Sequence, residues 1–227
     1  MKLQFAIDET SLAVDIHHCT VAGWTGRDAL AIQHHIDELA ALGVTPPSSV
    51  PLYYRVSSGI LSQAPEIEVV GGSSSGEVEP LVLANGGHLY LGLASDHTDR
   101  DLESHSVALS KQVCLKPVAD RLWHFDEVAD HLESIEMRSW IQEAGSADWV
   151  LYQEGSLSAI RPLTDLIAGA GLEQAAGQDT AAAMLCGTLG AKGGVRPAQT
   201  FRMELRDPVK GRTISHEYRI FELPVVA

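Results

Sequence analysis

The feature that most constrains the fold is a hairpin signal between two apolar runs. Asn85-Gly86-Gly87 separates the run that begins at Glu77 from the run His88 to Asp96. An Asn-Gly pair between apolar runs favours a tight turn, so the two runs are expected to pair as antiparallel strands. Any fold of this chain therefore has to accommodate a β-hairpin over these residues.

Three carboxylates are expected to meet on this hairpin. Glu77 and Glu79 are two residues apart and point to one face of a strand, and the antiparallel return brings Asp96 towards them. Neighbouring carboxylates repel each other unless a proton or a cation bridges them. Three carboxylates without a thiolate predict Mg²⁺ or Mn²⁺, with these three residues as ligands. The alternative is a solvated acidic face, which half-buried strands commonly carry.

The charge of the chain limits its partners. The 227 residues carry a formal net charge of −14 at pH 7, which disfavours binding to nucleic acid or to an anionic membrane surface. No apolar run approaches the roughly 18 residues of a membrane span, and the start lacks the apolar core of a signal peptide. Cys19, Cys114 and Cys186 are scattered in apolar surroundings and are expected to be reduced. A cytoplasmic protein is expected.

Two helices are expected near the hairpin. Thr25 begins a capping box and opens a helix that Gly43 closes, and Thr98 caps a second helix that runs to about Val113. Strands are expected at residues 2–7, 12–22, 52–56, 66–70, 199–206 and 213–223, a strand into a glycine turn at 183–190, a helix at 163–170 and a more helical stretch at 122–132.

Polar side chains on the two helices are candidate catalytic groups. His35 and Glu38 lie one turn apart on the first helix, where the carboxylate can orient the imidazole and raise its basicity. The alternative is a solvated surface pair. Lys111 lies in the last turn of the second helix, where the helix dipole stabilises a cation whether or not it faces the acids.

In this order, the segments resemble the fumarylacetoacetate hydrolase superfamily, and most closely an uncharacterised bacterial branch of it. The motifs that carry the resemblance are Gly26-Arg27-Asp28, His35-Ile36-Asp37-Glu38, Pro46-Pro47 with Pro51-Leu52-Tyr53, Glu77-Val78-Glu79, Ser95-Asp96-His97-Thr98-Asp99-Arg100-Asp101, Lys111 and Cys186-Gly187-Thr188-Leu189. The chain departs from the family at Ser95, where the family has Asn, at Leu189, where it has Pro, and in a shorter segment before Asp96.

The resemblance implies an α+β, β-rich fumarylacetoacetase-like fold, a mixed β-sandwich roll with a few flanking helices. Residues 1–227 would form one domain, in which 1–70 supply N-terminal strands and the His-x-x-Glu helix and 71–227 supply the metal-binding β core. The resemblance also implies a homodimer with Mg²⁺ or Mn²⁺ on Glu77, Glu79 and Asp96.

The activity that the resemblance implies is hydrolysis of a C–C bond in a small 2-oxo or 1,3-diketo acid. The catalytic residues would be His35 as general base, Glu38 as its partner and Lys111 as the stabiliser of an oxyanion. The substrate-binding residues would be Arg100, Gly187 and Thr188, although Arg100 would equally suit a structural pair with Asp99 or Glu103. The alternatives are a hydratase, isomerase or oxaloacetate-type decarboxylase on the same site, or a catalytically silent ligand-binding protein.

Overall fold

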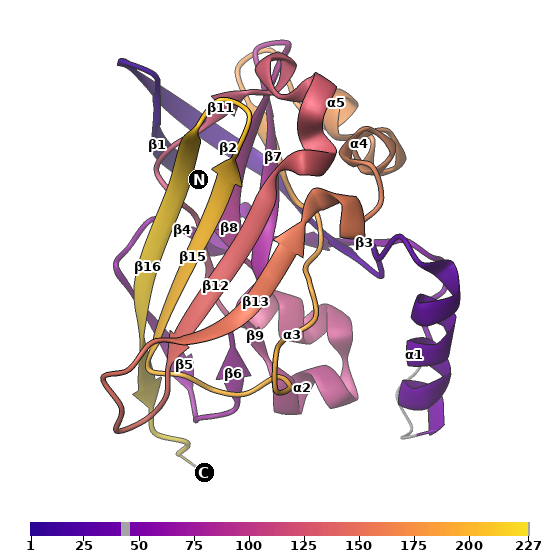
Figure 1. The fold of residues 1–227 in the computed structure, drawn as a ribbon, viewed down its shortest axis with the longest axis vertical. Coiled ribbons are helices and arrows are strands. Elements are labelled where there is room, and N and C mark those ends of the chain that lie inside the picture. Colours follow the sequence, from indigo (N-terminus) through magenta and orange to yellow (C-terminus); the bar gives the residue numbers. More distant parts are fainter. Residues whose placement is uncertain (42–45, 227) are drawn as a thin grey trace.

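The computed structural model describes residues 1–41 and 46–226, and the side chains of residues 35, 38 and 39 lie outside that description (Figure 1). The strands are β1 Lys2–Ile7, β2 Thr10–Gly23, β3 Leu52–Val56, β4 Leu61–Ser62, β5 Glu66–Val70, β6 Ser74–Ser75, β7 Val78–Asn85, β8 His88–Ser95, β9 Thr98–Asp99, β10 Lys116–Pro117, β11 Trp123–His124, β12 Glu136–Gln142, β13 Val150–Ser156, β14 Ala181–Leu185, β15 Thr200–Asp207 and β16 Arg212–Leu223. The helices are α1 Ala29–Ala41, α2 Arg100–His105, α3 Val107–Val113, α4 Leu163–Ala170 and α5 Leu172–Ala175.

Two sheets make up most of the fold. The larger has the order β1-β2-β14-β7-β8-β11, with β3 also paired to β2, and the second has the order β13-β12-β15-β16-β5. Strand β14 runs parallel to β2 and antiparallel to β7, so it joins the N-terminal strands to the central hairpin. The strand-rich α+β fold with a few flanking helices that the sequence predicts is confirmed.

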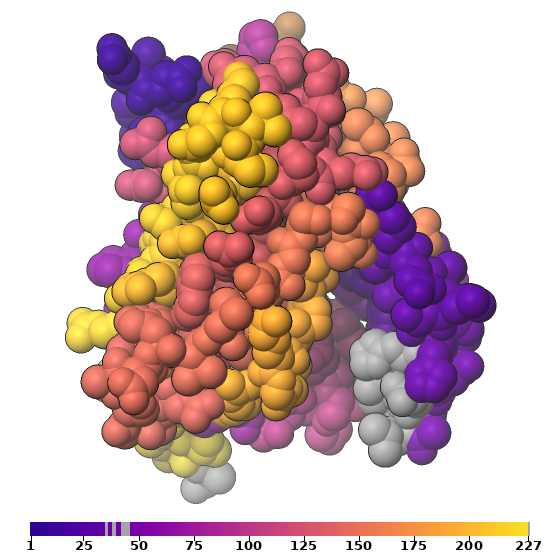
Figure 2. Space-filling model, in the orientation of Figure 1, coloured from indigo at the N-terminus to yellow at the C-terminus, as the bar shows by residue number. Residues whose placement is uncertain are grey.

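Apolar side chains fill both sides of the central hairpin. Leu91 and Leu93 of β8 belong to a buried cluster with Tyr152, Phe201 and Tyr218 of the second sheet. Alternate residues of β7 belong to another buried cluster, formed with the N-terminal strands. Burial on both faces makes the hairpin the centre of the molecule, and Figure 2 shows the second sheet across one face with α1 as a ridge at its side.

The predicted hairpin is confirmed in its register. Asn85 lies opposite His88, and Val78 lies opposite Ser95. The two residues of the turn, Gly86 and Gly87, have φ of 57° and 78°. Positive φ at both central positions is the backbone of a type I′ turn, which glycine adopts without strain.

The first predicted helix forms, but with a different cap. Helix α1 begins at Ala29, and the carboxylate of Asp28 accepts hydrogen bonds from the backbone N–H groups of Leu30 and Ala31 at 3.0 and 3.1 Å. Thr25 is buried four residues before α1, and its side chain packs against Gly187. The helix begins later than predicted, so Asp28, and not Thr25, directly precedes it and caps its first turn. The predicted end at Gly43 lies outside the described residues.

The second predicted helix is two short helices. Asp99, not Thr98, caps α2, and the chain is extended at Ser106, whose hydroxyl caps α3. Thr98 instead pairs with Ser75 in a two-residue bridge between β6 and β9. The break matters for the site because α3, which carries Lys111, forms a helix separate from α2.

The stretch 122–132 is also less helical than predicted. It contains strand β11 and 3-10 turns rather than an α-helix. Helix α4 occupies Leu163–Ala170, as predicted. No helix among the described residues is long and apolar enough to cross a membrane.

Candidate metal centre

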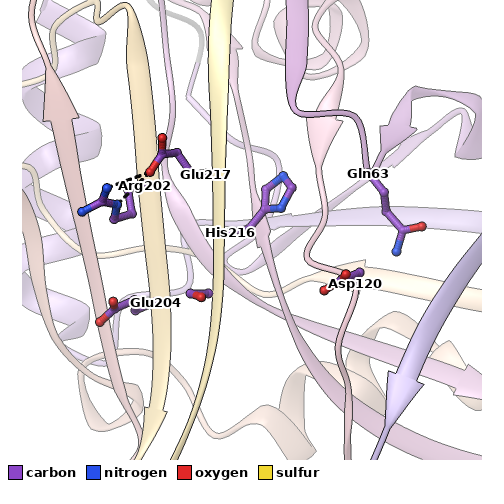
Figure 3. Close-up of a pocket in the computed structure, with 7 residues that line it drawn as sticks. Gln63, Asp120, Arg202, Glu204, His216 and Glu217 are labelled. Carbon is purple, nitrogen blue, oxygen red and sulfur yellow. Dashed lines mark hydrogen bonds and ion pairs between the residues drawn. The ribbon is translucent and has the colours of Figure 1, made fainter. Parts of the chain in front are cut away.

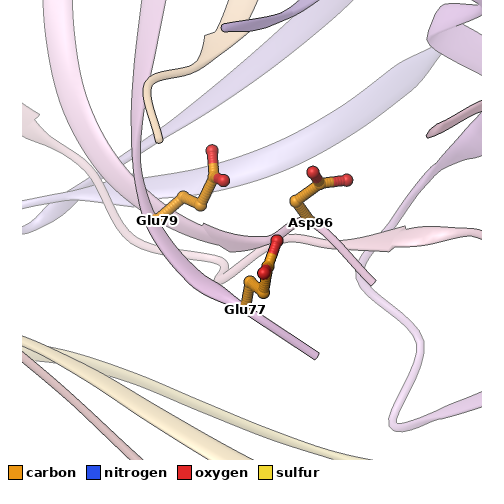
Figure 4. Close-up of side chains that lie close together, drawn as sticks. All are labelled: Glu77, Glu79 and Asp96. Atoms are coloured by element: carbon orange, nitrogen blue, oxygen red, sulfur yellow. The ribbon is translucent and has the colours of Figure 1, made fainter. Parts of the chain in front are cut away.

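Three carboxylates lie together at the open end of the central hairpin (Figure 4). Glu77 precedes β7, Glu79 is its second residue, and Asp96 follows β8. The backbone N–H of Asp96 donates to the carbonyl of Glu77 at 3.0 Å, which continues the hairpin ladder and fixes the two residues opposite each other. One oxygen from each carboxylate lies within 4.8 Å of the others. The structure thus brings together the three residues that the sequence predicts as metal ligands.

Burial makes the carboxyl group of Glu79 a weaker acid than usual. Its side chain is buried, and its Oε2 accepts a hydrogen bond from the backbone N–H of Gly187 at 2.8 Å. Burial raises the pKa of Glu79 well above its ordinary value, and the neighbouring carboxylates of Asp96 and Glu77 raise it further. Without an added cation, the carboxyl of Glu79 therefore favours its protonated form.

Two lysines hold the carboxylate of Asp96. Lys111 Nζ lies 2.7 Å from its Oδ2, and Lys116 Nζ lies 2.9 Å from its Oδ1. Burial alone would raise the pKa of Asp96, but the two ammonium groups outweigh it and hold the pKa well below the usual range. Asp96 is thus ionised, whereas Glu79 beside it favours the protonated form.

The sequence did not identify Lys116 as a site residue, because a lysine before a proline looks like the end of a helix. The side chain is fully buried, and its ammonium also donates to the carbonyl of His97. A usable signal is present: Lys116 interrupts the apolar run 113–119, and a lysine buried in such a run needs an acidic partner.

Arg100 holds the outer carboxylate of the trio. Its guanidinium lies 3.2 Å from Glu77 Oε1 and 2.8 Å from Glu103 Oε2, and its Nε donates to the hydroxyl of Ser75 at 2.7 Å. The predicted structural pair with Glu103 is confirmed, while Asp99 caps α2 instead. A role of Arg100 in binding a substrate stays a prediction.

Gly187 and Thr188 contact β7, the strand that carries Glu79. Gly187 has a φ of 101°, and the side chain of Thr25 occupies the space where a Cβ would lie, so a larger residue cannot fit there. Thr188 donates its hydroxyl hydrogen to the carbonyl of Val78 at 2.7 Å and accepts from Gln153 Nε2 at 2.8 Å. These contacts position Glu79, and the predicted contact of both residues with a substrate stays a prediction.

His35 and Glu38 lie three residues apart on α1. Their side chains lie outside the described part of the chain. Their predicted pairing, and their role as general base and partner, stay predictions.

A buried polar network lies behind the carboxylates. The ring of His97 is hydrogen-bonded to the hydroxyl of Tyr218 at 3.1 Å and to that of Ser74 at 2.9 Å, and Tyr218 also bonds Ser95 at 2.9 Å. Burial, helped by the charge of Lys116, lowers the pKa of His97 to about 3. The ring is therefore neutral at physiological pH. It joins Ser74 of β6 to Tyr218 of β16 through hydrogen bonds.

The trio suits a hard divalent cation. Its donors are carboxylate oxygens, the ligand type of Mg²⁺ and Mn²⁺, and Glu79 is a buried acid beside two others. Oxygens bound to one Mg²⁺ lie at most about 4.2 Å apart, so the three carboxylates, now within 4.8 Å of one another, need to draw together only slightly.

A surface hollow lies away from the carboxylates. It has a volume of about 440 Å³ and is bordered by residues of β15, β16 and two loops (Figure 3). Its lining residues are Gln63, Asp120, Arg202, Glu204, Ser215, His216 and Glu217. It contains no residue that the sequence predicts for the site.

Solved structures share this fold. A 2-keto-3-deoxy-D-arabinonate dehydratase complexed with magnesium and 2,5-dioxopentanoate matches at 12% identity with a TM-score of 0.63, over 97% of this chain and 79% of that chain. A fumarylacetoacetate hydrolase from psychrophilic Exiguobacterium antarcticum matches at 15% identity with a TM-score of 0.58, over 95% and 80% of the two chains. A candidate fumarylpyruvate hydrolase from Burkholderia cenocepacia matches at 16% identity with a TM-score of 0.60, over 99% and 96%.

The fold is therefore that of the fumarylacetoacetate hydrolase-like proteins, with a carboxylate trio at the open end of its central hairpin. The family described as "Protein of unknown function (DUF2848)" matches residues 22–218, and the chain belongs to this family. No curated protein sequence matches the chain.

Proposed function

We propose that the chain is a metal-dependent enzyme of the fumarylacetoacetate hydrolase superfamily that hydrolyses a C–C bond in a small 2-oxo or 1,3-diketo acid. The observation that carries the proposal is the carboxylate trio with oxygens within 4.8 Å of one another, in contact with the cationic side chains of Lys111, Lys116 and Arg100. The shared fold, which a magnesium-bound dehydratase also has, supports it.

The chemistry of an oxo acid matches this set of groups. A 2-oxo or 1,3-diketo acid offers two neighbouring oxygens that chelate a hard cation, and Mg²⁺ or Mn²⁺ on Glu77, Glu79 and Asp96 would stabilise negative charge on those oxygens. Cleavage of the C–C bond leaves charge on an enolate or oxyanion, which a nearby ammonium group also stabilises. The reaction therefore needs carboxylates that bind the cation and an ammonium group that stabilises the oxyanion, and the cluster contains both.

The two lysines take different roles. The side chain of Lys111 is 9% exposed, so its ammonium can meet a substrate oxygen and donate a hydrogen bond to it. Lys116 is fully buried behind Asp96 and positions that carboxylate instead. His35, with Glu38 as its partner, would remove a proton from the attacking water, and Arg100 would bind a carboxylate of the substrate.

A homodimer in the cytoplasm is part of the same proposal. Leu109 and Val113 lie one turn apart on α3 and are 60% and 57% exposed. A second subunit would cover this apolar pair and remove it from water. Sedimentation equilibrium measures the mass and decides between one chain and two.

The first experiment is calorimetric titration of the metal-stripped protein with Mg²⁺ and Mn²⁺. The Glu77→Ala/Glu79→Ala variant should lose binding. A matched control is Glu66→Ala/Glu68→Ala, which removes two exposed glutamates at the same spacing on β5 and should bind as the wild type does. If the wild type binds neither ion, or the first variant binds them normally, the trio is a structural cluster held by protons and cationic side chains, and the proposal fails.

The second step identifies the reaction. The loaded protein is incubated with a panel of 2-oxo and 1,3-diketo acids, and the products are separated by chromatography. A hydrolase yields two acids. A dehydratase, the second candidate because the magnesium-bound neighbour is one, yields a single product that has lost water. Ligand binding without metal and without turnover would instead indicate a catalytically silent binding protein.

A further inference from the structure

The ammonium group of Lys111 lies among the oxygens that would hold the metal. Its Nζ is 2.7 Å from Asp96 Oδ2, 3.3 Å from Glu103 Oε1 and 4.0 Å from Glu77 Oε2. Two of the three proposed ligands are therefore already in contact with a positive charge that belongs to the protein. Helix α3 begins after the extended residue Ser106 and carries Lys111 in its last turn.

The two lysines on Asp96 differ in their freedom to move. Lys116 is 0% exposed and is held on a second side by the carbonyl of His97. Lys111 is 9% exposed and extends from the last turn of a surface helix. A lysine on a flexible four-carbon stem can change its contacts by rotating, provided that it is not enclosed. Lys111 is thus the cation of the pair that can leave Asp96.

A divalent cation and this ammonium group exclude each other. Both are attracted to the carboxylates of Asp96 and Glu77, and like charges a few ångströms apart in a buried site repel strongly. The oxygens that bind one Mg²⁺ lie within about 4.2 Å of one another, which leaves little room for an ammonium group between them. Of the two lysines, only the movement of Lys111 relieves the conflict without opening the core.

We propose that Lys111 is a built-in competitor of the metal, whose ammonium group occupies Asp96 in the metal-free protein and leaves it when a divalent cation binds. The inference rests on the proposed metal site and goes beyond it, because it makes Lys111 the residue that sets the metal affinity. The ammonium that leaves Asp96 becomes available to an anionic substrate, so metal binding and substrate binding support each other.

The test is the affinity for Mg²⁺ of a variant that removes the charge and keeps the stem. By calorimetry, Lys111→Met should bind Mg²⁺ on the order of 10-fold more tightly than the wild type, the usual range of a coupling between two sites. Lys111→Arg, which keeps the charge, should show no such gain. Lys192→Met is the matched control, since Lys192 is 51% exposed and pairs with Glu154 outside the cluster. Unchanged or weaker binding by Lys111→Met overturns the proposal.

A second measurement uses the wild-type protein, in case the variant does not fold. The reactivity of Lys111 towards an acetylating reagent is followed by mass spectrometry with and without Mg²⁺. Release from Asp96 should raise it severalfold, while Lys192 stays constant. Equal reactivity in both conditions overturns the proposal.

The outcomes separate this inference from the proposed function. If Glu77→Ala/Glu79→Ala abolishes Mg²⁺ binding but Lys111→Met leaves it unchanged, the metal site stands and the competition does not exist. If Lys111→Met binds more tightly but no oxo acid is turned over, the competition stands and the hydrolase proposal fails. If the wild type and Lys111→Met bind no Mg²⁺, both fail.

Discussion

Two buried aspartates show how differently this chain treats a carboxylate. Asp207 is fully buried at the end of β15, where its Oδ1 accepts hydrogen bonds from the backbone N–H groups of Val209 and Lys210 in the following turn, both at 3.0 Å. His131 and Arg212 complete its contacts at 3.0 and 3.2 Å. Asp96 is equally buried, but its partners are flexible ammonium groups, and two more carboxylates lie beside it.

The difference separates a carboxylate that serves the fold from one that is available for chemistry. The donors of Asp207 are fixed by its own turn, so the charge is neutralised by the backbone that it organises. Around Asp96, the four carboxylates of Glu77, Glu79, Asp96 and Glu103 face the cations of Lys111, Lys116 and Arg100. A buried cluster with more acidic than basic groups is stable only if a proton or a metal ion balances its excess negative charge.

The largest effect should come from removing Asp207, the aspartate that serves the fold. Asp207→Ala leaves His131 without its carboxylate and Arg212 with Glu127 alone, and should lower the free energy of unfolding by about 3 kcal/mol. Mg²⁺ binding by the folded variant should not change. Urea denaturation measures the loss, with the exposed Asp148→Ala as control. A loss below about 1 kcal/mol would show that the turn does not depend on this carboxylate.

A smaller effect should follow from the neutral His97. Because its folded pKa is lowered to about 3 from 6.5, the unfolded chain binds a proton first as the pH falls. Stability is therefore lost progressively below pH 6.5, by about 1.4 kcal/mol per pH unit once the unfolded histidine is protonated.

The variant His97→Gln tests this contribution. Denaturation of variant and wild type at several values between pH 6.5 and pH 4.5 gives two slopes, and the difference between them isolates His97 from the other titrating groups. Parallel slopes would mean that the ring is charged in the folded protein.

The smallest effect should be a gain in stability at the metal centre. The folded pKa of Glu79 is raised by burial and by its acidic neighbours, so its contribution to stability is present below the unfolded pKa and is lost as the pH rises through the folded value. Glu79→Gln removes this charge and keeps an oxygen for the N–H of Gly187.

At pH 8, the metal-free Glu79→Gln variant should be about 1–2 kcal/mol more stable than the wild type, the scale of the cost of an incompletely paired buried group. Thermal unfolding in a chelator measures it. The variant should also lose most of its Mg²⁺ affinity. Lower stability than the wild type would show that the ionised carboxylate is well compensated.

The sequence predicts the parts of the site that depend on local geometry. The turn at Gly86-Gly87 and the alternation of a strand suffice to place Glu77, Glu79 and Asp96 together, and both follow from short-range rules. Helix α4 was predictable for the same reason, since an apolar stripe and a following glycine define it.

The contacts that come from distant segments were not predictable. Lys116 reaches Asp96 because β10 pairs in parallel with β4, and Gly187 reaches Glu79 across 108 residues. The split of the second helix was missed because Ser106 can either continue a helix or cap a new one, and the packing of α3 decides which.

The charged groups of the candidate centre come from one continuous stretch, from Glu77 to Lys116, while the chain segments that close around it come from elsewhere. This division separates the groups that carry charge from the groups that hold them in place. Substitutions near Thr25 and Thr188 would leave the charge pattern intact but would loosen the contacts that position Glu79, because Gly187 donates its N–H to that carboxylate and Thr188 holds the carbonyl of Val78.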